Sequence, residues 1–421
     1  MLRLDSQRRP VIKKLWTRDF TIFTLGNIVS VCGNSLAGFA INLMVLDYSN
    51  SVFLFILYLV IFNLPKILVP LIAGPFLDSF SRRKTIYTLD FISTATYISL
   101  FFIFGSGYFD YFFSLAMSLI LGTIDSAYSV AYESLYPVLV TEGNFRKAYS
   151  VSSSIMPLST VMLPVAAFLY ERIGISRILL FSAVVFFIAA CFETQVRADE
   201  THLRGKAGKS GKYRFAEFRA SFIEGVDYIK GEKGLLVITV FFLIISFSSA
   251  SDSLILPYFR DAPHLSIMLY TLYTGSNVVG RFVGGLIQYR IDYPTDKKFA
   301  IALFVYFSIC IFQMCLLFMP VYLMFVSGFL IGLLSVTSYN IRLSTTQSYV
   351  PDAKRARFNG SFFMFMNIGT IAGQLISGAL VDFNIPIRAV IIALYSVCVV
   401  AVYTVLWKGR RHVIPIYNRT V

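Results

Sequence analysis

The chain has 421 residues, of which 57% are hydrophobic and only 14% are charged. Soluble domains carry about 25% charged residues, and many apolar runs here exceed the roughly 18 residues needed to cross a bilayer, so the composition excludes a soluble globular protein. The net charge of +14 does not indicate nucleic-acid binding, because the basic residues lie mainly in the polar segments between apolar runs.

Twelve apolar runs are long enough to cross a membrane as helices, and short polar segments separate most of them. We therefore expect an all-α polytopic membrane protein with twelve transmembrane helices. In chain order these helices are expected at 19–46, 51–77, 85–106, 110–140, 147–170, 176–195, 235–257, 266–288, 299–319, 321–350, 358–381 and 387–407.

The positions of Lys and Arg predict how the helices are oriented. Of the 37 basic residues, four fall in loops on one side of the predicted membrane and three fall inside helices. These seven are Arg172, Arg177, Arg260, Arg388, Lys66, Arg281 and Arg342. The others lie in segments on the opposite side, and such basic segments remain cytoplasmic and attract anionic lipid. We expect a multi-pass protein of the bacterial inner membrane with both termini in the cytoplasm.

One sizeable polar segment divides the helices into two sets of six. Its second part, 215–230, spaces apolar residues as an amphipathic helix does, and we expect this helix to lie on the inner membrane surface. The predicted organisation is a basic N-terminus (1–18), an N-terminal bundle (19–196), a linker (197–234), a C-terminal bundle (235–407) and a basic tail (408–421).

The segment between the second and third predicted helices reads Gly74-Pro-Phe-Leu-Asp78-Ser-Phe-Ser-Arg82-Arg83-Lys84. It resembles the same loop of the major facilitator superfamily, whose pattern is Gly-x-x-x-Asp-Arg-x-Gly-Arg-(Arg/Lys)-(Arg/Lys). The five numbered residues match, and serine stands at the other two specified positions. One interpretation is a topology anchor, because three bases hold this end in the cytoplasm. The other is a conformational latch that contacts the second half near the start of helix 11.

The two halves of the chain repeat each other at an offset of 210 residues. Gly74 falls on Gly284 at the end of the second helix of each half, and Gly122 falls on Gly332 in the fourth helix. Two charged pairs in the next inner loop also coincide, Glu142 with Asp352 and Lys147 with Arg357. The repeat predicts two pseudo-symmetric six-helix bundles and extends the resemblance over most of the chain.

Three segments are similar to the macrolide-efflux-like branch of drug exporters, namely 131–140, 215–231 and 347–357. The resemblance implies a secondary active transporter that works by alternating access around a midplane site. Helix 5 carries Met156–Pro164 and lacks the Gly-x-x-x-Gly-Pro pattern of drug/proton antiporters in other branches, which leaves the antiport mechanism open.

Charged residues inside the predicted helices are the candidate functional residues, because a charge at mid-bilayer costs about 2.5–3.5 kcal/mol. Helical geometry places Asp125 and Glu133 of helix 4 about 80° apart, so both can face one cavity. By resemblance, the first and fourth helices of each half line the central cavity. We interpret both acids as contacts for a proton or a substrate; the alternative for Asp125 is a buried, hydrogen-bonded structural acid.

Further candidates lie in helices 1, 7 and 10: Asn34, Asp252 and Arg342. The 210-residue offset places Glu133 next to Arg342, so we expect this acid and base to approach when the inner gate closes. Three other intramembrane charges are explained as well by pairing within one half as by function. They are Lys66, Asp90 and Arg281.

Enzyme motifs are missing from the sequence, so no enzyme activity, cofactor or metal is expected. Gly208-Lys209-Ser210 lacks the first glycine of a phosphate-binding loop, and the three histidines are not clustered. The expected function is proton-coupled efflux of small amphipathic, drug-like or macrolide-like compounds by a monomeric antiporter. The alternatives are transport of a specific cargo (siderophore, lipid, peptide or nutrient), the membrane part of an ATP-driven pump, and a non-transporting receptor or scaffold.

Overall fold

The computed structural model describes residues 14–69, 81–141, 144–197, 211–290 and 293–418, and these ranges contain helices and turns without any β-strand. Ten helices in the described residues are long and apolar enough to cross a membrane. The all-α membrane fold is therefore confirmed. A kinked helix that holds two spans and the less apolar helix Ile267–Arg290 bring the crossing segments to the predicted twelve.

Most helices of the N-terminal bundle have a side-chain N-cap. Before four of the helices in the described residues, a Ser, Thr or Asp side chain accepts a hydrogen bond from the backbone N–H three residues later. This N–H has no acceptor within its own helix. These caps fix where the helices begin. The bundle contains α1 (Arg18–Ser49), α2 (Val52–Asn63), α4 (Arg82–Gly105), α5 (Tyr111–Leu139) and α6 (Phe145–Glu193).

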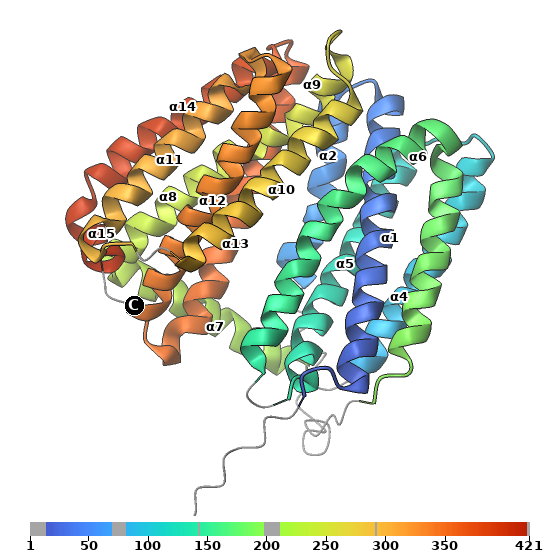
Figure 1. The fold of residues 1–421 in the computed structure, drawn as a ribbon, viewed down its shortest axis with the longest axis horizontal. Coiled ribbons are helices and arrows are strands. Elements are labelled where there is room, and N and C mark those ends of the chain that lie inside the picture. Colours follow the sequence, from blue (N-terminus) through green and yellow to red (C-terminus); the bar gives the residue numbers. More distant parts are fainter. Residues whose placement is uncertain (1–13, 70–80, 142–143, 198–210, 291–292, 419–421) are drawn as a thin grey trace, which may run out of the picture.

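Helix α6 holds two membrane spans. Its 49 residues would extend about 74 Å as one straight helix, more than twice the thickness of the hydrocarbon core. Gly174 has φ 76° and ψ 168°, a conformation that side chains other than glycine rarely adopt. The chain reverses there, and the two arms run antiparallel (Figure 1).

The C-terminal bundle follows the linker helix α7 (Gly211–Gly231) and ends in a short amphipathic helix, α15 (Arg410–Tyr417), whose apolar residues are buried. Its first span is built from α8 (Lys233–Ser249), η2 (Ala250–Leu254) and α9 (Ile255–Asp261). The other spans are α10 (Ile267–Arg290), α11 (Lys298–Cys315), α12 (Val321–Tyr349), α13 (Asp352–Asp382) and α14 (Ile387–Ala401), which continues as a π-helix, η5 (Val402–Trp407).

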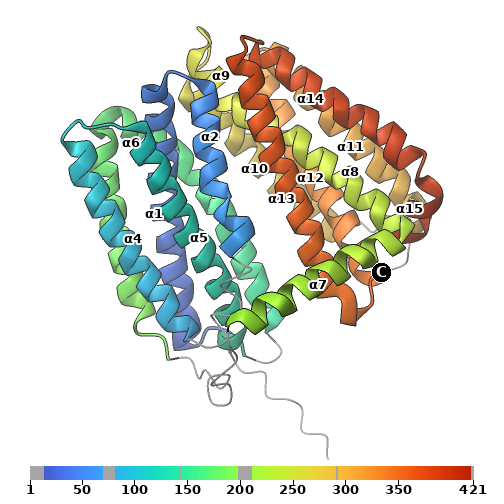
Figure 2. The ribbon, with the colours of Figure 1, turned by 180° about the vertical axis from the view of Figure 1, so that it is seen from behind.

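The two bundles meet at one end of the molecule and diverge toward the other (Figures 1 and 2). We call the end that holds α7 and the start of α1 the linker end, and the other the hairpin end. One buried cluster combines residues of both halves, among them Leu46 and Phe259. Two further clusters, around Tyr136 and around Tyr417, are each confined to one half. The structure is therefore closed at the hairpin end and open toward the linker end.

Matching glycines hold the second and fourth spans of each half together. A Cβ atom on Gly122 of α5 would overlap the carbonyl of Phe62 in α2, and one on Gly332 of α12 would overlap the carbonyl of Asn277 in α10. Small residues allow such close helix approach in membranes. The coincidence of Gly122 and Gly332 in the sequence therefore corresponds to equivalent packing in the two bundles.

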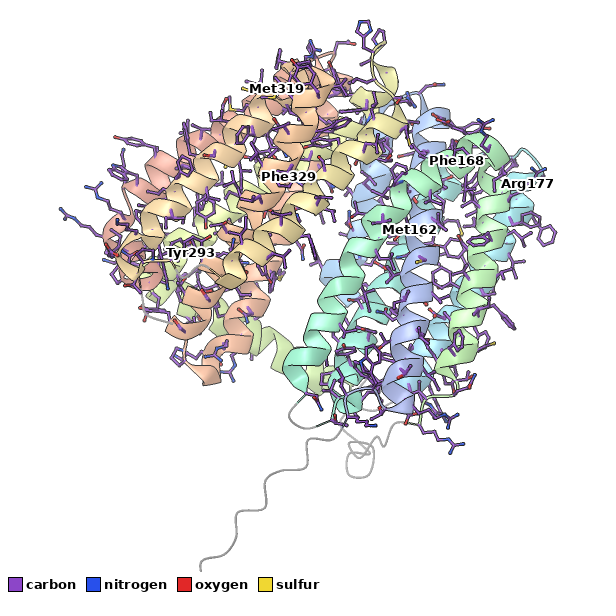
Figure 3. The ribbon with its side chains drawn as sticks, in the orientation of Figure 1. Met162, Phe168, Arg177, Tyr293, Met319 and Phe329 are labelled. Atoms are coloured by element: carbon purple, nitrogen blue, oxygen red, sulfur yellow. The ribbon has the colours of Figure 1, made fainter. Side chains whose placement is uncertain are left out.

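The seam between α10 and α12 is longer than this single contact. Gly280 of α10 lies against the backbone of Phe329, which is on α12 (Figure 3). One turn further, a Cβ on Gly284 would lie 2.9 Å from the carbonyl oxygen of Leu333. The two helices therefore touch backbone to backbone over more than one turn.

The linker helix α7 docks on α13 in addition to the membrane surface expected for it. Gly225 is buried where a Cβ would overlap the Ser361 hydroxyl and the Arg357 carbonyl, and Glu224 forms an ion pair with Arg357. The Ser361 hydroxyl also donates to the Phe222 carbonyl at 3.3 Å. The contact ties the linker to the C-terminal bundle.

Gly225→Leu is expected to separate α7 from α13. Overpacking costs about 1 kcal/mol or more, which changes the ratio of docked to undocked helix by a factor of roughly five or more. Limited proteolysis within 211–231 measures the change as faster cleavage. Gly231→Leu is the matched control, because a Cβ there has nothing within 4 Å. Equal cleavage of both variants would contradict the docked arrangement.

Candidate functional site

Three residues predicted from the sequence lie together inside the N-terminal bundle. The Lys66 ammonium lies 3.4 Å from Oδ2 of Asp125, and the Asn34 amide donates to Oδ1 at 3.1 Å. The side chains of Lys66 and Asp125 are 43% and 31% exposed, so the pair is reachable from outside the bundle. The local partner expected for Lys66 is therefore Asp125, and the cluster presents both signs of charge within a membrane-spanning region.

A small polar cavity lies beside this cluster, between α1, α4, α5 and α6. Its volume is about 80 Å³, which holds several water molecules but falls well below the roughly 300 Å³ or more of a drug-sized pocket. Its polar lining consists of Ser30, Asn34, Asp90, Ser93, Tyr97, Asp125 and Tyr128. The cavity therefore suits water and protons and is too small for a drug-sized cargo.

A pair of acids lies deeper in the same bundle. Asp90 of α4 and Glu193 of α6 are each 1% exposed, and their carboxyl groups lie within hydrogen-bonding reach of each other. The Ser30 hydroxyl donates to Asp90 at 2.7 Å, and the Tyr128 hydroxyl donates to Glu193 at 2.9 Å. Sequence reasoning missed Glu193, because a charge close to the end of the predicted span 176–195 is indistinguishable from an ordinary boundary residue.

Arg342 is buried in the C-terminal bundle against aromatic rings. Its guanidinium lies 4.9 Å from the ring centre of Phe362, 5.0 Å from that of Phe242 and 5.5 Å from that of Tyr339, distances at which the ring faces stabilise a cation. Glu133 is exposed on α5, and no ion pair joins it to Arg342 within the described residues. The approach of these two residues stays a prediction for a state that is closed at the linker end.

The other intramembrane candidates have local partners. Asp252 accepts hydrogen bonds from the Tyr395 hydroxyl at 2.8 Å and the Gln313 amide at 3.3 Å, which places its carboxylate between α14 and α11 within the C-terminal bundle. Arg281 is exposed on α10 and donates to the Asn277 side chain at 3.1 Å. Neither contact reaches the N-terminal bundle.

The predicted latch comprises Gly74, Asp78, Arg82, Arg83 and Lys84, of which the first two lie outside the described residues. Arg82 donates to the Ser134 carbonyl at 2.9 Å, and Arg83 donates to the Val196 carbonyl at 2.5 Å. Lys84 is exposed in the first turn of α4. The Val196 carbonyl lies just beyond the C-terminal end of α6, where a positive charge is favourable. In this state the two arginines thus contact their own half.

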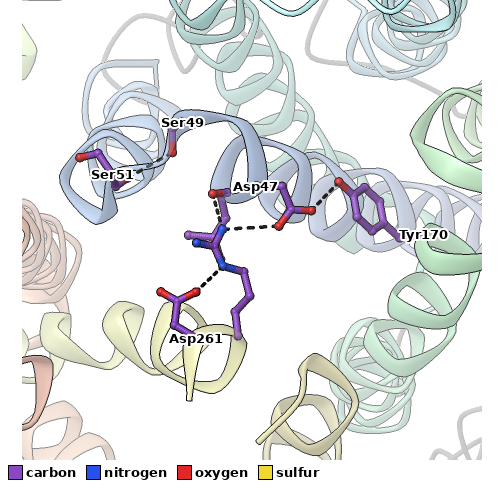
Figure 4. A network of polar contacts seen from close by, with 7 residues as sticks. Asp47, Ser49, Ser51, Tyr170 and Asp261 are labelled. Carbon is purple, nitrogen blue, oxygen red and sulfur yellow. Dashed lines mark hydrogen bonds and ion pairs between the residues drawn. The ribbon is translucent and has the colours of Figure 1, made fainter. Parts of the chain in front are cut away.

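A polar network at the hairpin end joins the two halves (Figure 4). Arg260 of α9 donates to the Leu46 carbonyl of α1, contacts the Asp47 carboxylate at 3.4 Å and bonds to Asp261 at 2.7 Å. The Tyr170 hydroxyl of α6 donates to Asp47 at 2.9 Å. Sequence reasoning counted Arg260 only as a loop charge, because its partners come from distant parts of the chain. The network stabilises the closed hairpin end.

Comparison with known proteins agrees with the fold. The sequence pattern of the Major Facilitator Superfamily matches residues 23–312 and 262–415. The uncharacterized MFS-type transporter YkuC of Bacillus subtilis (strain 168) is 24% identical over 286 residues, which cover 65% of this chain and 66% of that protein. The chain therefore spans slightly less than two thirds of that relative's length.

Two solved transporters share the fold at low sequence identity. The nucleoside transporter NupG superimposes with a TM-score of 0.68 at 12% identity, covering 94% of this chain and 99% of its own. A peptide transporter POT gives 0.67 at 13% identity, covering 93% and 94%. With the two bundles, the membrane-spanning helices and the matching family pattern, these results show that this membrane protein belongs to the Major Facilitator Superfamily.

Proposed function

We propose that the protein exports small amphipathic compounds in exchange for protons and that Asp125 carries the proton. The observation that carries this proposal is the contact of Asp125 with Lys66 and Asn34 at a half-exposed position inside a membrane bundle. A proton that binds Asp125 removes its charge and releases Lys66, so protonation and ion pairing exclude each other. Asp125 is then either charged and paired with Lys66 or neutral and unpaired, and these are the two electrostatic states that a transporter can alternate between.

The open linker end supports this assignment. Because basic segments remain cytoplasmic, we place this end in the cytoplasm of a bacterial inner membrane, with the protein acting as a monomer. A cargo then enters between the bundles from the cytoplasm and leaves after the hairpin end opens. Arg82, Arg83 and Lys84, together with Asp78, act as a latch when the linker end closes. The similarity of three segments to macrolide exporters supports the direction and the class of cargo.

A second candidate is transport of a specific polar cargo. Lys66 and Asp125 present a cation and an anion at half-exposed positions, and a zwitterionic compound can bind to both. Peptides and amino acids have this charge pattern. The transport experiment described next distinguishes this cargo class from amphipathic drugs.

The test measures efflux and uptake with a panel of dyes, antibiotics, nucleosides and dipeptides in cells that express the wild type, Asp125→Asn or Asp227→Asn. Asp227 is an exposed acid on α7 and provides the matched control. We expect dye or antibiotic efflux that a protonophore and Asp125→Asn both abolish, while Asp227→Asn has no effect. Efflux that survives Asp125→Asn but not the protonophore would show that another group carries the proton. Movement of dipeptides alone would favour the second candidate.

A further inference from the structure

We propose that Asp90 and Glu193 hold one proton between them and form a proton-binding site separate from Asp125. The two carboxyl groups approach each other from α4 and α6, and both side chains are 1% exposed. Two adjacent carboxylates that are both buried cannot both remain ionised without a compensating charge. A proton shared between them removes this conflict.

The surrounding groups do not supply the missing positive charge. Ser30 of α1 and Tyr128 of α5 each donate one hydrogen bond, and Tyr132 of α5 is the other titratable group that faces Glu193. Among the described residues, no Lys or Arg forms an ion pair with either acid. Of the bases that begin α4, Lys84 is exposed and Arg83 donates to the Val196 carbonyl. A proton is then the remaining source of charge compensation.

The hydrogen-bond geometry shows where this proton fits. Oε2 of Glu193 is buried and has no donor among the described residues, although Asp90 lies within reach. An ionised carboxylate only accepts hydrogen bonds, whereas a protonated one also donates. With one proton on the pair, one carboxyl can donate a hydrogen bond to the other, so that the pair contains a donor as well as acceptors.

A metal cation fits this position poorly. Gly26 of α1 packs against the acid so closely that a Cβ would lie 3.1 Å from Cγ of Glu193, which leaves no room for a hydration shell on that side. No group of three or more His, Cys, Asp or Glu side chains in the described residues is arranged to hold a metal ion. The ligand is therefore a proton, and sodium serves as the competing hypothesis in the test.

The small polar cavity described above connects the Asp90–Glu193 pair with Asp125, the proposed proton carrier. Asp90, Ser30, Tyr128 and Asp125 all line it, so a proton can pass between the buried pair and the half-exposed Asp125 through water and hydroxyl groups. This relay role rests on the proposed function, whereas the shared proton itself does not depend on any cargo. The two claims are therefore tested by separate measurements.

Infrared difference spectroscopy of the purified protein in lipid nanodiscs tests the shared proton. We expect the wild type at pH 7 to show the C=O band of a protonated carboxyl group that shifts in D₂O and disappears at high pH. The double variant Asp90→Asn/Glu193→Gln loses this band, and Asp125→Asn retains it. Glu171→Gln, which changes an exposed acid on the same helix as Glu193, is the matched control and retains it too.

Thermal unfolding provides a readout that separates a proton site from a merely structural contact. Loss of the shared proton leaves two adjacent anions, so the unfolding temperature of the wild type falls as the band disappears with rising pH. The double variant carries neutral amides of similar size and loses this pH dependence. A band that survives in the double variant, a band that Asp125→Asn removes, or an unfolding temperature that follows sodium instead of pH would each overturn the proposal.

Discussion

Gly332→Leu is expected to prevent the C-terminal bundle from assembling. A Cβ at this position overlaps the Asn277 carbonyl and lies 3.0 Å from the Arg281 nitrogen, so the obstacle is the backbone of α10 and not a flexible side chain. Overpacking of this kind costs about 1–3 kcal/mol or more, a large part of a total stability of roughly 5–15 kcal/mol. Size-exclusion chromatography of detergent extracts measures the result as loss of the monodisperse peak.

The same experiment has a control and a symmetric counterpart. Gly285→Leu changes a glycine of α10 whose Cβ would have nothing within 4 Å, so it is expected to elute like the wild type. Gly122→Leu, which meets the Phe62 carbonyl, is expected to damage the N-terminal bundle to a similar degree. A normal elution profile for Gly332→Leu would refute the close backbone contact.

Arg260→Ala is expected to open the hairpin end. The variant removes the contacts of Arg260 with Leu46 and Asp47, which join the two halves. Hydrogen bonds to charged groups contribute about 1.5 kcal/mol at the lower limit of their range, which suits a partly exposed network. That loss raises the population of the open hairpin end roughly tenfold.

A cysteine at position 39 reports this opening. Phe39 of α1 stacks on Tyr270 of α10 at 6.3 Å between the bundles, where reagents reach it only after separation. In a background without the native cysteines, Phe39→Cys should react about tenfold faster with an impermeant maleimide when Arg260 is replaced. Arg388→Ala is the control, because Arg388 contacts only rings of its own half, Tyr258 and Phe318, in the described structure. Equal acceleration by both variants would argue against an inter-bundle role for Arg260.

The sequence was sufficient to predict the features that depend on one segment of the chain alone. Apolar runs predicted the spans, and the offset between Gly122 and Gly332 predicted the repeat that the packing displays. Asp125 was identifiable as a candidate because a charge in the middle of an apolar run is conspicuous. The structure brings it together with Lys66, for which the sequence indicated only some local partner.

Features that depend on pairing between distant segments could not be predicted. In the sequence Glu193 is an ordinary helix-end residue, and only the position of α6 beside α1 and α4 shows that it is buried. The partners of Arg260 come from α1, more than 200 positions earlier in the chain. The docking of α7 depends on Gly225 meeting α13, and nothing in the amphipathic pattern of α7 specifies that neighbour. Hydrophobic periodicity identifies the buried face of a helix but not what covers it.

The glycine seams have a mechanical consequence for transport. Where helices touch backbone to backbone, as α2 and α5 do at Gly122 and α10 and α12 do at Gly280 and Gly332, no side chain lies at the contact that could slide or repack. We therefore expect each bundle to move as one stiff lever, with the pivots where α2 meets α13 and α6 meets α10 through side chains. The largest cargo is then limited by how far the levers swing, and bending of individual helices contributes little to it.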